Sequence, residues 1–217
     1  MPAEKKSITN FCLNGNMEKL LTKKLVKELR ALPGEARGMN LKNDADFILG
    51  KKGEQGLRQM EAEMKKVDYP LDYSQIKAYE FYPIGMRAAS LLAARQVFDW
   101  NNEDIKEMCG FATYITLIGR IGLKFFHSID DIALHASQLW KEYFSQGELS
   151  IPDYDLEKKY AVIRVKGFDG HPIFCPCMAG YFEKLGKITT KTKKVKVKET
   201  KCQYKGDDCD EFLIKWE

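Results

Sequence analysis

Six cysteines occur in this chain of 217 residues, and four of them lie between positions 175 and 209. Thiolates are strong ligands for zinc, which needs four donors around a compact tetrahedron. Cys202 and Cys209 flank a predicted turn, so their side chains can converge, and Glu199 could join them if the strand bends there. Cys175 or Cys177 would supply the remaining donor. The clustering predicts a zinc site.

Two other interpretations of these cysteines stay open. All four could be ordinary buried or half-buried thiols, or the Cys-Pro-Cys triplet at 175–177 could act in redox chemistry. Four protein donors would leave no position for activating water, so the zinc is expected to be structural and no catalytic residue is assigned. Cys12 and Cys109 are isolated in the sequence and are expected to be packing residues.

A histidine and several aromatic residues suggest a ligand pocket. His127 follows Phe126 at the junction of two apolar helical patterns, where a pocket mouth could open and an imidazole could hydrogen-bond a ligand. Candidates for the pocket wall are Tyr82, Phe126, Trp140, Tyr154 and Phe174, although such an aromatic set is more often plain core. We therefore expect a mostly apolar cavity near His127.

Several functional classes have no support in the sequence. There is no G-x-G-x-x-G after a strand, no G-x-S-x-G and no H-E-x-x-H, so a nucleotide cofactor, a serine nucleophile and a catalytic zinc are not indicated. These absences favour a binding protein over an enzyme. No apolar run is long enough to span a membrane and no secretory signal is seen, so a cytoplasmic protein is expected.

The net charge of +4 conceals a lysine-rich run between positions 184 and 205. Lysine alternates there with threonine and valine, which is typical of a strand with one solvated face. Nucleic-acid binding is not favoured, because no aromatic residue interleaves the run for base stacking.

Helical patterns fill the first two thirds of the sequence, and a strand pattern follows. Helices are predicted over 17–32, 41–66 with a break at its glycines, 84–98, 101–126 and 128–145. A strand at 160–166, a short helix at 172–186 and a hairpin of 193–204 with 211–216 come next. This order predicts an α+β fold in which a helical layer packs on a twisted antiparallel β-sheet. Residues 1–35 are expected to be an N-terminal helical extension, and residues 36–217 one ligand-binding domain.

The segments CPCMAGYFEKLGK, VKVKETKC and KGDDCDEFLI resemble the 4-vinyl reductase domain family. The matching residues are Cys175, Gly180, Tyr181, Glu199, Cys202, Gly206, Asp207, Cys209 and Phe212. The resemblance extends to the aromatic-sensing modules of bacterial transcription activators, and it implies zinc ligands Cys175, Glu199, Cys202 and Cys209. Cys177 is an additional thiol that could replace Cys175 or Glu199. The family's fold is shared with vesicle-tethering subunits and loosely with haem nitric-oxide sensors.

The resemblance implies a pocket under the helices for an apolar, aromatic or tetrapyrrole-like ligand. The expected function is therefore a cytoplasmic, zinc-containing, small-molecule-binding domain of the sensor type, working as a homodimer. The expected ligand-binding residues are His127, Phe126, Trp140, Tyr154 and Phe174. Two alternatives are an enzyme or accessory protein in tetrapyrrole vinyl reduction, and a dimeric interaction protein that uses its helical face.

Overall fold

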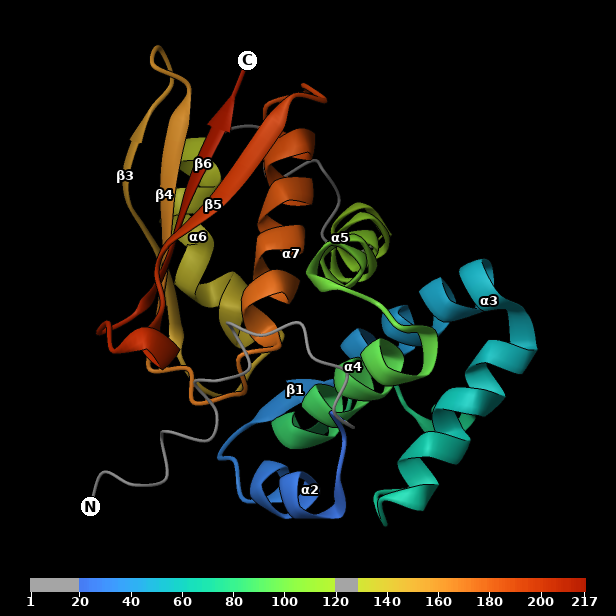
Figure 1. Ribbon diagram of the computed structural model, residues 1–217. Coiled ribbons are helices and arrows are strands. Elements are labelled where there is room, and N and C mark those ends of the chain that lie inside the picture. Colours follow the sequence, from blue (N-terminus) through green and yellow to red (C-terminus); the bar gives the residue numbers. More distant parts are fainter. Residues whose placement is uncertain (1–19, 120–128) are drawn as a thin grey trace.

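The computed structural model describes residues 20–119 and 129–217, in two groups of elements that meet at a helical layer. Figure 1 shows helices α2, α3 and α4 in one group, and strands β3–β6 with helices α6 and α7 in the other. Helix α5 lies between them and packs on α7 and on α3. The predicted α+β fold is confirmed, with helices on one antiparallel sheet.

Helices α2 (Lys23–Arg30) and α4 (Ile84–Phe98) pack together in the first group. Thr22 sets the start of α2, because its Oγ1 accepts a hydrogen bond from the backbone N–H of Leu25 at 3.2 Å. Val26 and Leu29 are the buried face of α2. Helix α4 is buried on most of its surface, because its alanine and leucine residues lie on several faces of the helix.

Helix α3 (Gly38–Lys66) is bent where its glycines predicted a break. Gly53 has φ 66° and ψ −173°, a conformation available almost only to glycine. A two-stranded ribbon of β1 (Glu35–Arg37) and β2 (Phe81–Pro83) flanks α3. These strands were not predicted, because three residues are too few to show a period.

Helix α5 (Asn102–Gly119) and helix α6 (Ile129–Lys141) are two of the predicted helices. The predicted end of the first of these helices lies outside the described residues. Helix α6 ends earlier than predicted, because the chain after it hydrogen-bonds to β1. The N–H of Arg37 donates to the carbonyl of Tyr143 at 2.8 Å, and the N–H of Ser145 donates to the carbonyl of Glu35 at 3.0 Å. These bonds join the two groups of elements.

The main sheet has the strand order β3-β4-β6-β5, and all its neighbours are antiparallel. Its strands are β3 (Glu148–Asp155), β4 (Tyr160–Lys166), β5 (Val195–Lys201) and β6 (Asp210–Trp216), with α7 (Phe174–Thr189) between β4 and β5 in the sequence. Strand β3 was not predicted, since Pro152 and a register shift between Ser150 and Asp153 interrupt its alternation. None of the described helices is long and apolar enough to cross a membrane.

Candidate functional site

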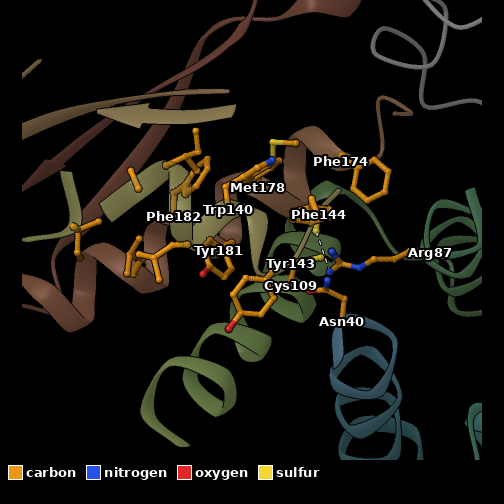
Figure 2. Close-up of a pocket in the computed structure, with 16 residues that line it drawn as sticks. Asn40, Arg87, Cys109, Trp140, Tyr143, Phe144, Phe174, Met178, Tyr181 and Phe182 are labelled. Atoms are coloured by element: carbon orange, nitrogen blue, oxygen red, sulfur yellow. Dashed lines mark hydrogen bonds between the residues drawn. The ribbon is translucent and has the colours of Figure 1, made fainter. Parts of the chain in front are cut away.

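A cavity of about 60 Å³ lies where α6 and α7 meet α3, α4 and α5 (Figure 2). Most of its wall is apolar. Ile132, Ala136 and Trp140 contribute from α6, and Phe174, Met178 and Phe182 contribute from α7. These positions recur at helical spacing, so the apolar stripes of two neighbouring helices face each other across the cavity.

Trp140 presents carbon atoms to the cavity, because its one polar atom is bonded elsewhere. Its Nε1 donates to the carbonyl of Gln146 at 2.7 Å. Its ring stacks on Phe144 with 4.5 Å between centroids, and it meets Phe168 edge-on at 5.3 Å. This aromatic cluster holds the indole in place, so the wall is rigid on that side.

The opposite end of the cavity is polar, and Arg87 of α4 is its centre. Only 4% of this side chain is exposed. Its Nε donates to Asp44 Oδ2 at 3.3 Å, and its Nη2 donates to the Cys177 sulfur at 3.5 Å. Burial raises the pKa of the Asp44 carboxyl, and Arg87 opposes that rise. A hydrogen bond with Cys109 and the Arg87 charge lower the pKa of the Cys177 thiol against the effect of burial.

Asn40 of α3 lines the same cavity and has an unsatisfied donor. Its Nδ2 is buried and has no hydrogen-bond partner in the protein. Figure 2 shows Asn40, Arg87 and Cys109 gathered at one end of the cavity, with Trp140 and Phe182 towards the other. A buried donor without a partner destabilises a protein by roughly 1–3 kcal/mol, so native proteins contain few of them. The polar end is therefore suited to a ligand with an acceptor atom.

Two of the residues predicted for the ligand site, Trp140 and Phe174, line this cavity. Tyr154 does not, because it lies on β3 and its hydroxyl donates to Asp130 of α6 at 2.5 Å. His127 and Phe126 lie outside the described residues. Tyr82 belongs to β2, where its hydroxyl oxygen accepts from the N–H of Lys77 at 3.0 Å.

Sequence reasoning did not select Asn40 or Arg87. The signal for Arg87 was present, since it is one of only two charged residues in segment 84–98, which is rich in alanine and leucine. A charge on a helix that is buried on most faces must find a partner in the core. No local pattern marked Asn40, because nothing in the sequence indicates which polar residue of α3 will face a cavity.

The predicted metal ligands are only partly brought together. One ligand atom each from Cys175, Glu199, Cys202 and Asp210 lie within 4.8 Å of one another, and the two sulfurs are 3.9 Å apart. Cys209 is not in this group, because its thiol donates to Asp208 at 3.5 Å. Asp210, the buried first residue of β6, supplies the fourth ligand atom of the group instead.

The protein's own contacts already use part of this cluster. Both carboxylate oxygens of Asp210 accept hydrogen bonds from Gln203, at 2.9 and 3.0 Å. Burial, with the nearby Glu199 adding to it, raises the pKa of Asp210 to about 6. The Nζ of Lys205 lies 3.6 Å from Oε2 of Glu199. Cys177, the additional thiol that could have replaced Cys175 or Glu199, is not in this cluster, and its sulfur accepts from Arg87 at the cavity.

No protein-family model matches the chain, and no curated protein is significantly similar to it. Solved structures with the same fold do exist. An H-NOX protein from Shewanella oneidensis in the Fe(II)NO state has a TM-score of 0.64 at 12% identity, over 83% of this chain and 99% of that chain. A variant H-NOX protein from K. algicida, in the unliganded Fe(II) state, has a TM-score of 0.61 at 10% identity, over 83% and 96%. At such identities the similarity establishes the fold alone.

These comparisons correct two expectations. The resemblance to the 4-vinyl reductase family is wrong, because the similar structures are H-NOX proteins and no family model matches. Vinyl reduction, which rested on that resemblance alone, loses its support. The expectation of zinc as the cofactor is also wrong, since the proteins that share the fold are heme proteins.

The cavity that the described residues form is too small for a heme. Histidine is the commonest axial ligand of heme iron, and neither described histidine lines the cavity. Cysteine, methionine and tyrosine, which heme iron also accepts, do line it, so the ligand types alone do not exclude a heme. His135 is exposed with its Nδ1 against the carbonyl of Asp131 at 2.8 Å, and the His171 Nδ1 accepts from the N–H of Ile173 at 3.1 Å. The cavity, of about 60 Å³, is far smaller than a porphyrin, whose ring system has more than twenty non-hydrogen atoms.

Proposed function

We propose that this chain is a small-molecule-binding domain of the sensor type, and that its ligand binds in the cavity between α6, α7 and the Asn40–Arg87 end. The observation that carries the proposal is the pairing of an apolar wall with a buried, unpartnered donor at one end. Small-molecule sites are usually apolar cavities with a few polar groups that orient the ligand. Homodimer formation and the partner that receives the signal stay predictions.

The position of the cavity supports a sensor rather than a catalyst. Its wall combines α3 and α4 from one group of elements with α6 and α7 from the other. A ligand that contacts both groups stabilises one arrangement of them over others, which is how binding is converted into a conformational signal. The described lining residues include no histidine and no carboxylate.

The test uses methylenecyclopentane, a compact apolar ring, as the probe. We expect it to raise the melting temperature of the native chain, because a ligand that binds the folded state stabilises it by mass action. Room for the ring comes from Met178, whose flexible thioether can adopt other rotamers. Ala136→Leu fills the cavity from α6 and should abolish the shift, since Ala136 is buried in the wall.

Leu134→Ala is the matched control on the same helix, because 79% of that side chain is exposed. This variant should respond to the probe as the native chain does. A shift that persists in Ala136→Leu, or no shift in the native chain, contradicts the proposal. The absorbance of the purified protein provides a second measurement. A Soret band would show that heme binds and that the cavity opens much further than described.

A further inference from the structure

We infer that the ligand of this cavity carries a neutral hydrogen-bond acceptor, of the carbonyl type, on a compact apolar body, and that Asn40 Nδ2 donates to it. This inference rests on the proposed function and adds the chemical class of the ligand. It follows from three features of the cavity: an unused donor, a charge balance at the polar end, and an apolar wall.

The unused donor requires an acceptor. Asn40 is 8% exposed, its Nδ2 has no partner in the protein, and it lines the cavity. Arg87 also lines this end, and a guanidinium offers donors only. Asp44, whose Oδ2 accepts from Arg87 Nε, is not among the residues that line the cavity. The amide nitrogen of Asn40 and the guanidinium nitrogens of Arg87 are therefore donors. An acceptor oxygen on the ligand would give Asn40 Nδ2 the hydrogen bond that it lacks.

The charge balance favours a neutral acceptor over a carboxylate. Arg87 is already paired with the Asp44 carboxylate at 3.3 Å and contacts the Cys177 thiol, whose pKa is lowered. Asp44 has a second buried oxygen, Oδ1, which has no hydrogen-bond partner. An anionic ligand would enter a site where the positive charge of Arg87 is already compensated. Removing the charged ligand from water would cost free energy that no unpaired positive charge in the site would offset.

The apolar wall sets the rest of the ligand. Ile132, Phe174 and Phe182 are each buried and offer no hydrogen-bonding atom in their side chains. A second polar group of the ligand that faced these three side chains would lose its water without gaining a partner. The small volume of about 60 Å³ limits the ligand to a few non-hydrogen atoms beyond its carbonyl.

The experiment compares cyclopentanone with methylenecyclopentane, which differ only in a carbonyl oxygen against a methylene group. The alkene is less soluble in water than the ketone, so it enters any apolar cavity more readily. The measured quantity is therefore the ratio of the two dissociation constants, compared between the native chain and each variant. Asn40→Leu removes the donor while keeping the number of side-chain atoms. We expect the ratio to move about fivefold to tenfold against cyclopentanone in this variant, the effect of one buried hydrogen bond.

Asn43→Leu is the matched control. Asn43 is on the same helix, is also buried, and also has an unpartnered Nδ2, but it does not line the cavity. The ratio should be unchanged in this variant. The carbonyl stretching frequency of bound cyclopentanone gives an independent readout, since a donated hydrogen bond lowers it in the native chain and not in Asn40→Leu. Asn40→Ala replaces Asn40→Leu if the latter does not fold.

An unchanged ratio in Asn40→Leu overturns the inference, and so does tighter binding of cyclopropanecarboxylate than of cyclopentanone. In both cases the proposed function stands, because methylenecyclopentane still binds the native chain. If neither ring binds the native chain, the proposed function fails first. The two failures are therefore distinguishable.

Discussion

A Cβ atom added at Gly180 of α7 would lie 2.0 Å from the backbone carbonyl oxygen of Lys106 of α5. The two helices are thus in backbone contact at this point. Helix α5 has a glycine at the same crossing, and a Cβ added at Gly110 of α5 would lie 3.0 Å from the carbonyl oxygen of Gly180. This contact places Cys109 and Cys177, which neighbour the crossing, at the polar end of the cavity. Glycine is required at Gly180 because any side chain would separate the helices.

Gly180→Ala should therefore destabilise the protein. The added methyl group meets rigid backbone, and overpacking of this kind costs about 1–3 kcal/mol or more. Urea unfolding measures the change in the free energy of unfolding. Gly50→Ala is the control, since Gly50 is an exposed position of α3 with no atom within 4 Å of its added Cβ. That change should stabilise the helix by roughly 0.5–1 kcal/mol. Equal effects of the two substitutions would refute the close crossing.

The bend in α3 gives a second prediction. Gly53 has a positive φ of 66° with an extended ψ, so alanine cannot adopt its conformation without strain. Gly53→Ala should cost about 1–3 kcal/mol, although nothing lies within 4 Å of its added Cβ. Comparison with Gly50→Ala in the same unfolding experiment separates conformational strain from steric contact. A stabilising Gly53→Ala would show that α3 can run straight.

Arg87 and Asp44 are a buried pair, so removing one partner should be far worse than removing both. Arg87→Met leaves the Asp44 carboxylate buried and uncompensated, and should cost about 3–5 kcal/mol. The double variant Arg87→Met with Asp44→Leu should recover much of this loss. Urea unfolding of the two variants provides the test.

The pH dependence of Arg87→Met provides a further check. Burial already raises the pKa of Asp44, and loss of Arg87 removes the group that opposes the rise. A folded-state pKa above the unfolded one means that the folded state binds the extra proton. The variant should therefore regain stability as the pH falls. In the urea experiment, a double variant Arg87→Met with Asp44→Leu that is as unstable as Arg87→Met alone would show that the two residues are not a coupled pair.

His171 should make the stability depend on pH below neutrality. Burial, with a contribution from the positive charge of Arg95, lowers its pKa from the ordinary 6.5 to about 4. The unfolded state then binds more protons between these values, so stability is fully present above about pH 6.5 and is lost as the pH falls towards 4. The loss is on the order of 3 kcal/mol.

His171→Asn is the variant that tests this assignment, because an amide oxygen can replace the Nδ1 that accepts from Ile173. Unfolding measured between pH 4 and 7 should show a shallower slope in this variant than in the native chain. An identical slope in both would assign the acid sensitivity to other groups.

The amino-acid sequence alone determined the elements whose residues repeat with a clear period. Helix α4 follows the predicted bounds of 84–98, and strand β4 follows those of 160–166, because each carries an apolar pattern over its whole length. The break in α3 was also readable from its glycines, since a glycine inside a helix weakens it locally. The α+β class then followed from the order of these patterns.

Only the tertiary structure decided which side chains meet. Asn40, Arg87 and Cys177 come from three helices that are distant in the sequence, and no local pattern records their approach. The same reason explains the cysteine cluster, where Asp210, at the start of β6, joins the group and the neighbouring Cys209 does not. Side chains alternate along a strand, so a single position changes the face that is reached. Periodicity depends on neighbours along the chain, whereas a site depends on distances across the fold.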